Sequence, residues 1–193
     1  MKLILMFVGL MGLLGFGQAS AQMMTYTESV TASGTLGTSS FTDKTFTLTG
    51  TAEASDITTV PPGVLLVSDL TATVDISGLG LATFTDPIST YVRNGTTVAG
   101  FVDFTSGTDI LDTTNAAFAS YNLASSIGPL SGAAIASIGN IYNTTLGKLT
   151  LYSVSQDATF EATAAPEPSV FCLEACGVLF VFVVGQLRFK RLT

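Results

Sequence analysis

The alternation of Thr with apolar residues is the feature that most limits what this chain can fold into. Between residues 22 and 165, Ser and Thr occupy 44 of 144 positions, a composition that suits strands and turns better than helices. In segments 45–49, 70–76 and 149–152, Thr alternates with apolar residues. Successive side chains of a strand point to opposite faces of a sheet, so each segment predicts a strand with one buried face.

Other strands and turns follow from the same patterns. Further strands are expected at residues 25–33, 81–85, 97–104 and 158–162. Asn94-Gly95 predicts a type I′ hairpin turn, and Val60-Pro61-Pro62-Gly63 predicts a break in the chain. Segment 115–121 is expected to form one helical turn, and segment 131–138 a loop or a short helix. Short strands at this spacing predict an all-β fold for residues 22–164, an antiparallel β-sandwich-like domain.

The N-terminal segment, residues 1–21, has the parts of a secretory signal peptide. Lys2 is followed by an apolar run over residues 3–16, and Ala19-Ser20-Ala21 has the small residues of a cleavage site. We therefore expect signal peptidase to cut after Ala21, so that the mature chain begins at Gln22 and its β domain is exported.

The C-terminal segment carries a second apolar run, followed by a basic end. Nineteen residues from 169 to 187 would form a helix of roughly 28 Å, close to the thickness of the hydrocarbon layer of a membrane. This predicts a single C-terminal transmembrane helix. Arg188, Lys190 and Arg191 in the basic end 188–193 are expected to stay cytoplasmic, because positive residues favour that side. The β domain is then expected on the side of the inner membrane that faces away from the cytoplasm.

Three residues within this apolar run are unusual. Glu174 either marks the outer end of a span that begins at Ala175 or contacts a membrane partner, and its position near the outer end favours the first interpretation. Cys172 and Cys176 are the only cysteines of the chain, and their role stays open. Since neither lies in residues 22–164, the exported domain cannot contain a disulfide.

Charge and composition exclude several functions. Between residues 22 and 165, twelve Asp and Glu face three basic residues, a net charge of 3 − 12 = −9, so a nucleic-acid partner is not expected. The chain contains no His, which removes Ser-His and Cys-His catalysis. A pair of carboxylates remains conceivable as a catalytic site, but no motif identifies one. We therefore expect a protein that is not an enzyme and needs no cofactor.

Asp103, Asp109 and Asp112 are the weak candidates for a metal site. Hard oxygen ligands around a glycine turn can bind Ca²⁺, but their spacing does not match the known calcium-binding loop of helix–loop–helix proteins. Solvated acids that cap their own loops are the favoured interpretation, so no metal is expected.

The order of these features carries a resemblance. Pro166-Glu167-Pro168 is followed by Ser169, the apolar run and the basic end, and the segment 165–193 therefore resembles the sorting tail of PEP-CTERM proteins. The resemblance implies that an exosortase-type membrane protease recognises this tail and acts at or near residues 166–168. It also implies transient anchoring in the inner membrane, followed by release or transfer of the domain to the cell surface, often into an exopolysaccharide matrix.

Three functions remain open at this point. The leading hypothesis is a structural or interaction protein of the cell envelope or extracellular matrix. A carbohydrate-binding or adhesion module is the alternative, and it requires tyrosines exposed on one concave face: Tyr26, Tyr91, Tyr121, Tyr142 and Tyr152. The third hypothesis is a membrane protein whose tail is never cut.

Overall fold

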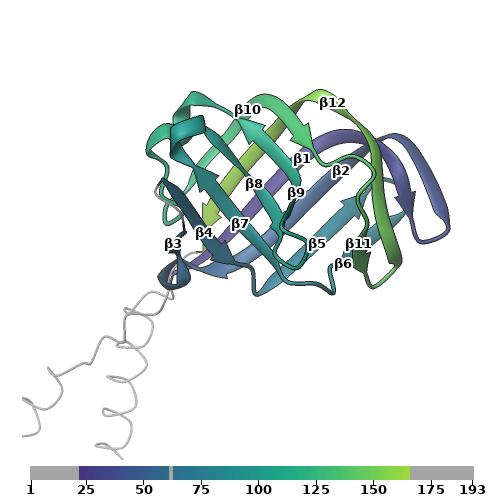
Figure 1. Ribbon diagram of the computed structural model, residues 1–193, viewed down its shortest axis with the longest axis horizontal. Helices are drawn as coiled ribbons and strands as arrows, with labels where there is room; N and C mark the ends of the chain where they lie inside the picture. The colour runs from purple at the N-terminus through teal and green to yellow at the C-terminus, as the bar shows by residue number, and fades with distance from the viewer. Residues whose placement is uncertain (1–21, 61–62, 166–193) are drawn as a thin grey trace, which may run out of the picture. The chain divides into compact units, whose positions relative to one another are not determined.

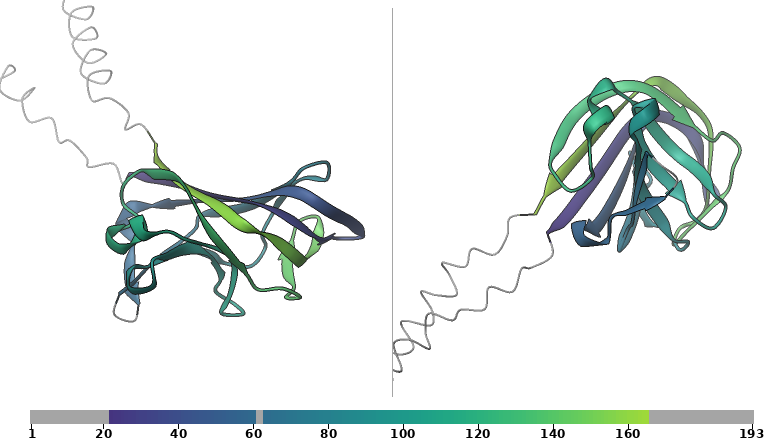
Figure 2. Two further views of the ribbon diagram at one scale, coloured as in Figure 1. Left: turned by 90° about the horizontal axis from the view of Figure 1, so that it is seen from above. Right: turned by 60° about the vertical axis from the view of Figure 1, so that its left-hand side comes forward.

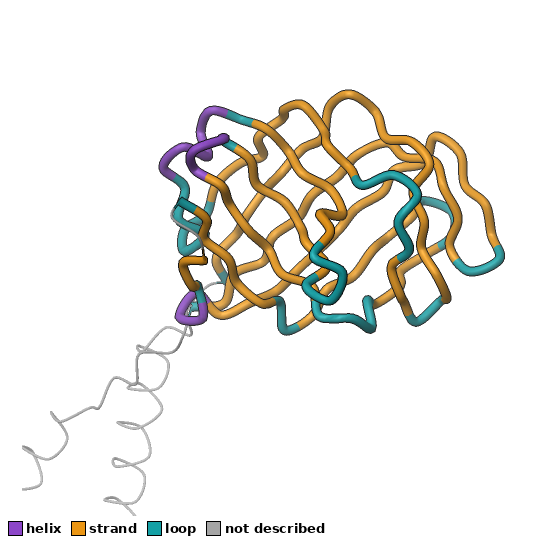
Figure 3. The backbone as a smooth tube through the Cα atoms, viewed as in Figure 1, coloured by secondary structure: helices purple, strands orange, loops and turns teal. Residues whose placement is uncertain are grey.

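About two thirds of the described residues lie in strands. The computed structural model describes residues 22–60 and 63–165. Figure 1 shows twelve strands and Figure 3 the short loops that join them. The strands are β1 (Met23–Leu36), β2 (Ser39–Glu53), β3 (Thr58–Val60), β4 (Val64–Ser68), β5 (Thr71–Ile76), β6 (Gly80–Thr83), β7 (Ile88–Arg93), β8 (Val98–Asp103), β9 (Thr108–Thr114), β10 (Ile127–Ala136), β11 (Tyr142–Thr144) and β12 (Gly147–Ala164). Three single-turn 3₁₀ helices lie between them: η1 (Ala54–Asp56), η2 (Asn94–Thr96) and η3 (Ala116–Ser120).

The strands form one continuous sheet with the order β3-β4-β7-β8-β9-β10-β12-β1-β2-β5-β6, and β11 pairs with β12. Every pairing is antiparallel. The predicted all-β antiparallel fold is therefore confirmed, although one sheet folds over on itself where two separate layers are the usual sandwich arrangement (Figure 2, right). Edge strand β6 reaches β11 through the bridge between Phe84 and Thr144.

The alternating pattern of β1 explains how the sheet acquires a core. Its even-numbered residues from Met24 to Leu36 are buried, whereas the odd-numbered ones between them are exposed or half-buried. The same alternation over residues 46–52 of β2 places Phe46 and Leu48 beside them. Side chains from both halves of the folded sheet meet in this core, where the Phe118 and Phe160 rings lie edge-to-face with centroids 5.4 Å apart.

The two ends of the domain lie side by side. Met24 in β1 pairs with Ala164 in β12, and the Ala165 amide donates to the Met23 carbonyl at 2.8 Å. The turn between β1 and β2 lies at the opposite end of these long strands (Figure 2, left). Residues that precede and follow the domain therefore attach at one end of it.

Two local predictions were wrong. Asn94-Gly95 does join a hairpin, β7 to β8, but through the 3₁₀ turn η2 and a left-handed Thr97 (φ 56°) in place of a type I′ turn. The Asn94 side chain donates to the Phe118 and Tyr121 carbonyls at 2.6 and 2.9 Å, which holds the turn against η3. The segment 131–138, expected as a loop or short helix, lies largely in β10, where pairing with β9 and β12 overrides the weak strand preference of Ala and Gly.

No helix among the described residues is long and apolar enough to span a membrane. The predicted transmembrane helix 169–187 lies outside the described residues, as do the signal peptide 1–21 with Ala19 and Ala21, the triplet Pro166-Glu167-Pro168, and Glu174 with its neighbouring cysteines. The basic residues Arg188, Lys190 and Arg191 lie outside them as well.

Candidate functional site

A charged cluster lies across β7, β8 and β9. Tyr91 in β7 and Asp112 in β9 both pair with Gly100 of β8, so their side chains flank a position with no side chain of its own. The Arg93 guanidinium lies over the Tyr91 ring, 4.4 Å from its centroid, and donates to both Asp109 carboxylate oxygens at 3.2 and 3.0 Å. Arg93 and Asp109 are partly exposed, whereas Tyr91 and Asp112 are buried beneath them.

Burial sets the charge of the inner members of this cluster. It raises the pKa of Asp112 from 3.8 to about 7, an effect that the Tyr91 hydroxyl and Arg93 partly offset and Asp109 reinforces. Burial also raises the pKa of Tyr91, which stays neutral. Tyr91 Oη and Asp112 Oδ1 are both buried without a hydrogen-bond partner. The cluster therefore holds a carboxyl group that changes charge near neutral pH beside the Arg93–Asp109 salt bridge.

Two more acids are tied to threonines inside the fold. Thr113 of β9 donates to Glu28 Oε1 of β1 at 2.7 Å, and Thr90 of β7 donates to both oxygens of Asp69 at 3.0 and 3.2 Å. Burial raises the pKa of Glu28 and of Asp69 well above the ordinary range, and the threonine hydrogen bonds only partly oppose it. In both acids, burial therefore favours the protonated form.

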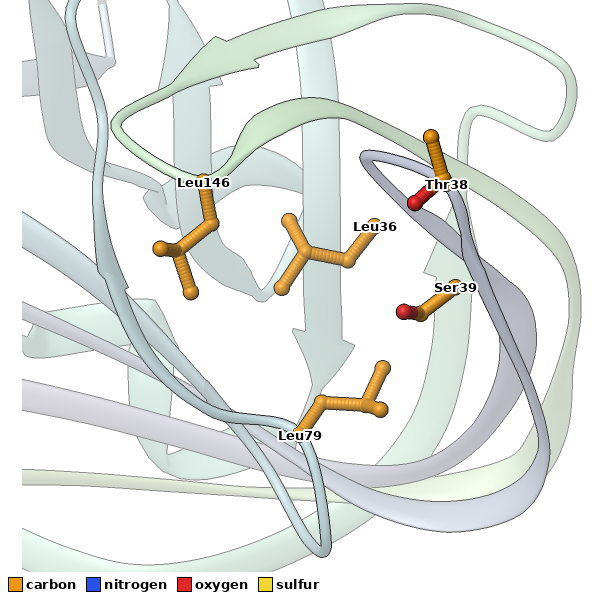
Figure 4. A pocket seen from close by; sticks show the side chains of 5 residues that line it. All are labelled: Leu36, Thr38, Ser39, Leu79 and Leu146. Atoms are coloured by element: carbon orange, nitrogen blue, oxygen red, sulfur yellow. The ribbon is translucent and has the colours of Figure 1, made fainter.

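A shallow pocket lies elsewhere, among the hairpin tips. It has a volume of about 210 Å³ and is lined by Leu36, Thr38, Ser39, Leu79 and Leu146 (Figure 4). These residues lie in or directly beside the turns β1–β2, β5–β6 and β11–β12. No acid lines this pocket, so this hollow does not hold a carboxylate pair of the kind that hydrolases use.

The three candidate metal ligands have separate roles. Asp103 accepts hydrogen bonds from the Thr105 amide at 2.8 Å and the Ser106 hydroxyl at 2.9 Å, and so caps its own loop. Asp109 pairs with Arg93, whereas Asp112 is the buried member of the cluster. Within residues 22–60 and 63–165, no three His, Cys, Asp or Glu side chains are placed to hold a metal ion.

The tyrosines do not form a sugar-stacking face. Tyr26, Tyr91, Tyr121 and Tyr142 are at most 4% exposed, and only Tyr152 of the five is open to solvent, at 59%. The Tyr26 and Tyr142 hydroxyls donate to the Leu123 and Asp109 carbonyls at 2.7 and 3.1 Å, so they serve the packing of the domain.

Sequence reasoning missed Glu28, Asp69, Tyr91 and Arg93 as members of polar clusters. Only Glu28 carried a local signal, because it occupies an inward position of the alternating segment 25–33 where every neighbour on that face is apolar or small. The other three meet their partners because β4 pairs with β7, and because β7 and β9 both pair with β8, an arrangement that no local pattern indicates. No family model matches the chain, and no curated protein or solved structure is significantly similar to it.

Proposed function

We propose that this chain is an exported bacterial protein of the cell envelope or extracellular matrix, with a structural or interaction role, delivered by its C-terminal tail. In this proposal residues 1–21 direct export, residues 169–187 form a transmembrane helix, and Arg188, Lys190 and Arg191 hold its end in the cytoplasm. An exosortase-type protease then acts at or near Pro166-Glu167-Pro168. The β domain passes to the cell surface or the surrounding polysaccharide.

The observation that carries this proposal is the position of the domain boundary. The last strand, β12, ends at Ala164, and Pro166 follows after a single residue. Cutting at or near residue 166 therefore removes no strand and no core residue of the described domain. A sorting signal that is removed after use requires such a boundary, because a cut inside β12 would separate β1 from its partner.

Two further observations favour a structural role over sugar binding. Four tyrosines are used in packing, so the aromatic platform that the carbohydrate alternative requires is not formed. The outward positions of β1, β2 and β5 carry Thr and Ser in register, as in Thr25–Thr51–Thr71 and Thr27–Thr49–Thr73. This gives a hydrophilic face suited to a hydrated matrix.

The test replaces Pro166, Glu167 and Pro168 together by alanine in the producing bacterium. We expect the wild-type chain at the cell surface or in the medium without its tail, and the variant retained in the inner membrane with the tail attached. Cell fractionation and intact mass measure both. The matched control replaces Thr58, Thr59 and Val60 of exposed strand β3 by alanine and should be sorted like the wild type. Identical location and mass for the triplet variant and the wild type would defeat the proposal, and would leave the permanently anchored alternative if both remain in the membrane.

A further inference from the structure

The contact between Thr113 and Glu28 joins two strands that are distant in the sheet. Glu28 projects from β1 into the core and is 0% exposed, and Thr113 on β9 is equally buried. β10 and β12 lie between these strands in the sheet order, so the contact spans the folded interior. Thr113 Oγ1 lies 2.7 Å from Glu28 Oε1, and Oε2 of the same carboxyl has no hydrogen-bond partner.

This pair has the chemical state that ester formation needs. Burial, with a smaller contribution from Asp112, raises the pKa of Glu28 well above its ordinary value, which favours the protonated carboxylic acid. A carboxylic acid has an electrophilic carbon and a hydroxyl that can leave as water, whereas a carboxylate repels a nucleophile. The threonine hydroxyl is the nucleophile, and it already contacts the carboxyl group.

We propose that Thr113 and Glu28 form an intramolecular ester, a covalent cross-link between β9 and β1 through the core. Thr113 Oγ1 bonds to Glu28 Cδ, and the bond from Cδ to the carboxylic hydroxyl breaks. That hydroxyl leaves with the threonine proton as one water molecule. The reaction needs no oxidant, cofactor or second substrate.

The close contact of Thr113 with Glu28 and the exclusion of water both favour the ester. Two groups held in reactive contact behave as if at about 10⁵–10⁸ M, which opposes the excess of water that normally drives ester hydrolysis. Complete burial of both side chains also keeps bulk water from the product. The second acid–threonine pair is less well shielded from water. Thr90 donates to both Asp69 oxygens, at 3.0 and 3.2 Å, but Asp69 is only partly buried, whereas Glu28 is completely buried.

The cross-link would give the domain a covalent link between strands, which its composition does not otherwise allow. The chain has no cysteine between residues 22 and 165, so a disulfide cannot staple the exported domain. An ester between residues 28 and 113 would close a loop of more than half the domain, and closing a long loop restricts the unfolded chain most.

Peptide mapping of the full chain tests this. The folded protein is incubated, then unfolded and digested in acid, where esters survive. We expect the peptides that contain Glu28 and Thr113 to appear as one species, lighter than their sum by one water. Mild alkali in isotopically labelled water should separate them and place one labelled oxygen on the pair. Recovery of both residues only in separate, unmodified peptides from the wild type would overturn the proposal without need of any variant.

Two variants test which threonine forms the ester. Thr113→Val removes the nucleophile with little change of shape, and should yield only separate peptides. Thr90→Val removes the hydroxyl of the other acid–threonine pair, and should keep the cross-linked species. A cross-link that survives Thr113→Val or disappears in Thr90→Val would show that the assigned atoms are wrong.

Discussion

Replacing Asp112 by Asn should remove much of the pH dependence of folding stability. The Asp112 carboxyl is 2% exposed, and its pKa rises from 3.8 to about 7 in the folded domain. Between the two pKa values, the unfolded chain has released the Asp112 proton, whereas the folded domain still holds it. Raising the pH over this range therefore favours unfolding, and the stability present below the unfolded pKa is lost as the pH reaches the folded pKa. Wild-type stability should therefore fall between about pH 4 and pH 7.

The magnitude follows from the shift. Each pKa unit corresponds to about 1.4 kcal/mol, and roughly two of the three units lie between pH 5 and pH 8, so Asp112 should account for up to about 3 kcal/mol of lost stability. Asp69 acts in the same direction, since burial raises its pKa. Glu28 adds to this effect only in chains that lack the ester, where burial raises its pKa too. Tyr91, Arg93 and Asp109 surround Asp112, and Arg93 and Asp109 form a salt bridge beside it.

Urea unfolding at pH 5 and pH 8, at constant ionic strength, measures this effect. We expect wild type to be more stable at pH 5, and Asp112→Asn to show a clearly smaller difference between the two conditions. Asp75→Asn, which alters an exposed carboxylate on β5, is the control and should behave like wild type. Equal pH dependence in wild type and Asp112→Asn would refute the reasoning.

The remaining predictions concern β10 and the Asp103 loop. Gly132→Ala should lower the free energy of unfolding by about 1–3 kcal/mol, because a Cβ there would collide with the Thr114 carbonyl. The control Gly95→Ala, whose Cβ would meet nothing within 4 Å, should be nearly neutral. Equal urea midpoints for the two variants would contradict the close approach of β10 to β9. Asp103→Ala should cost about 1 kcal/mol and speed amide hydrogen exchange at Thr105 and Ser106, which lose their acceptor; unchanged exchange would show that the cap is unimportant. Added calcium should leave the wild-type unfolding temperature unchanged, because Asp103 and Asp109 are already engaged; a rise that Asp103→Ala abolishes would establish a metal site.

Sequence reasoning predicted the parts of the fold in which one face is buried. Segments 25–33, 45–49 and 70–76 alternate Thr with apolar residues, and they lie in β1, β2 and β5 with the apolar side inward. Segments 149–154 and 158–162 proved to be one bent strand, β12, whose pairing with β1 is interrupted by bulges. The bulges break the alternation, which explains why the sequence suggested two separate strands.

Two strands without alternation, β7 and β10, were not among the predicted strands. Nearly every residue of β7 is buried on both faces, including Ser89 and Thr90, so period-two alternation is absent. β10 is rich in Ala and Gly and owes its conformation to its neighbours, with Gly132 required where it passes the Thr114 carbonyl. The acid clusters were equally hidden, because Glu28 meets Thr113 only after the sheet folds over, and Asp69 meets Thr90 only once β4 pairs with β7.

The mass of the mature chain recovered from the cell surface tests the central claim most directly. If the tail is a sorting signal, top-down mass spectrometry should find a chain that begins at Gln22 and ends at or near residues 166–168, with β12 complete. A surface or membrane population that retains residues 169–193 throughout, with no shortened form in any fraction, would contradict it.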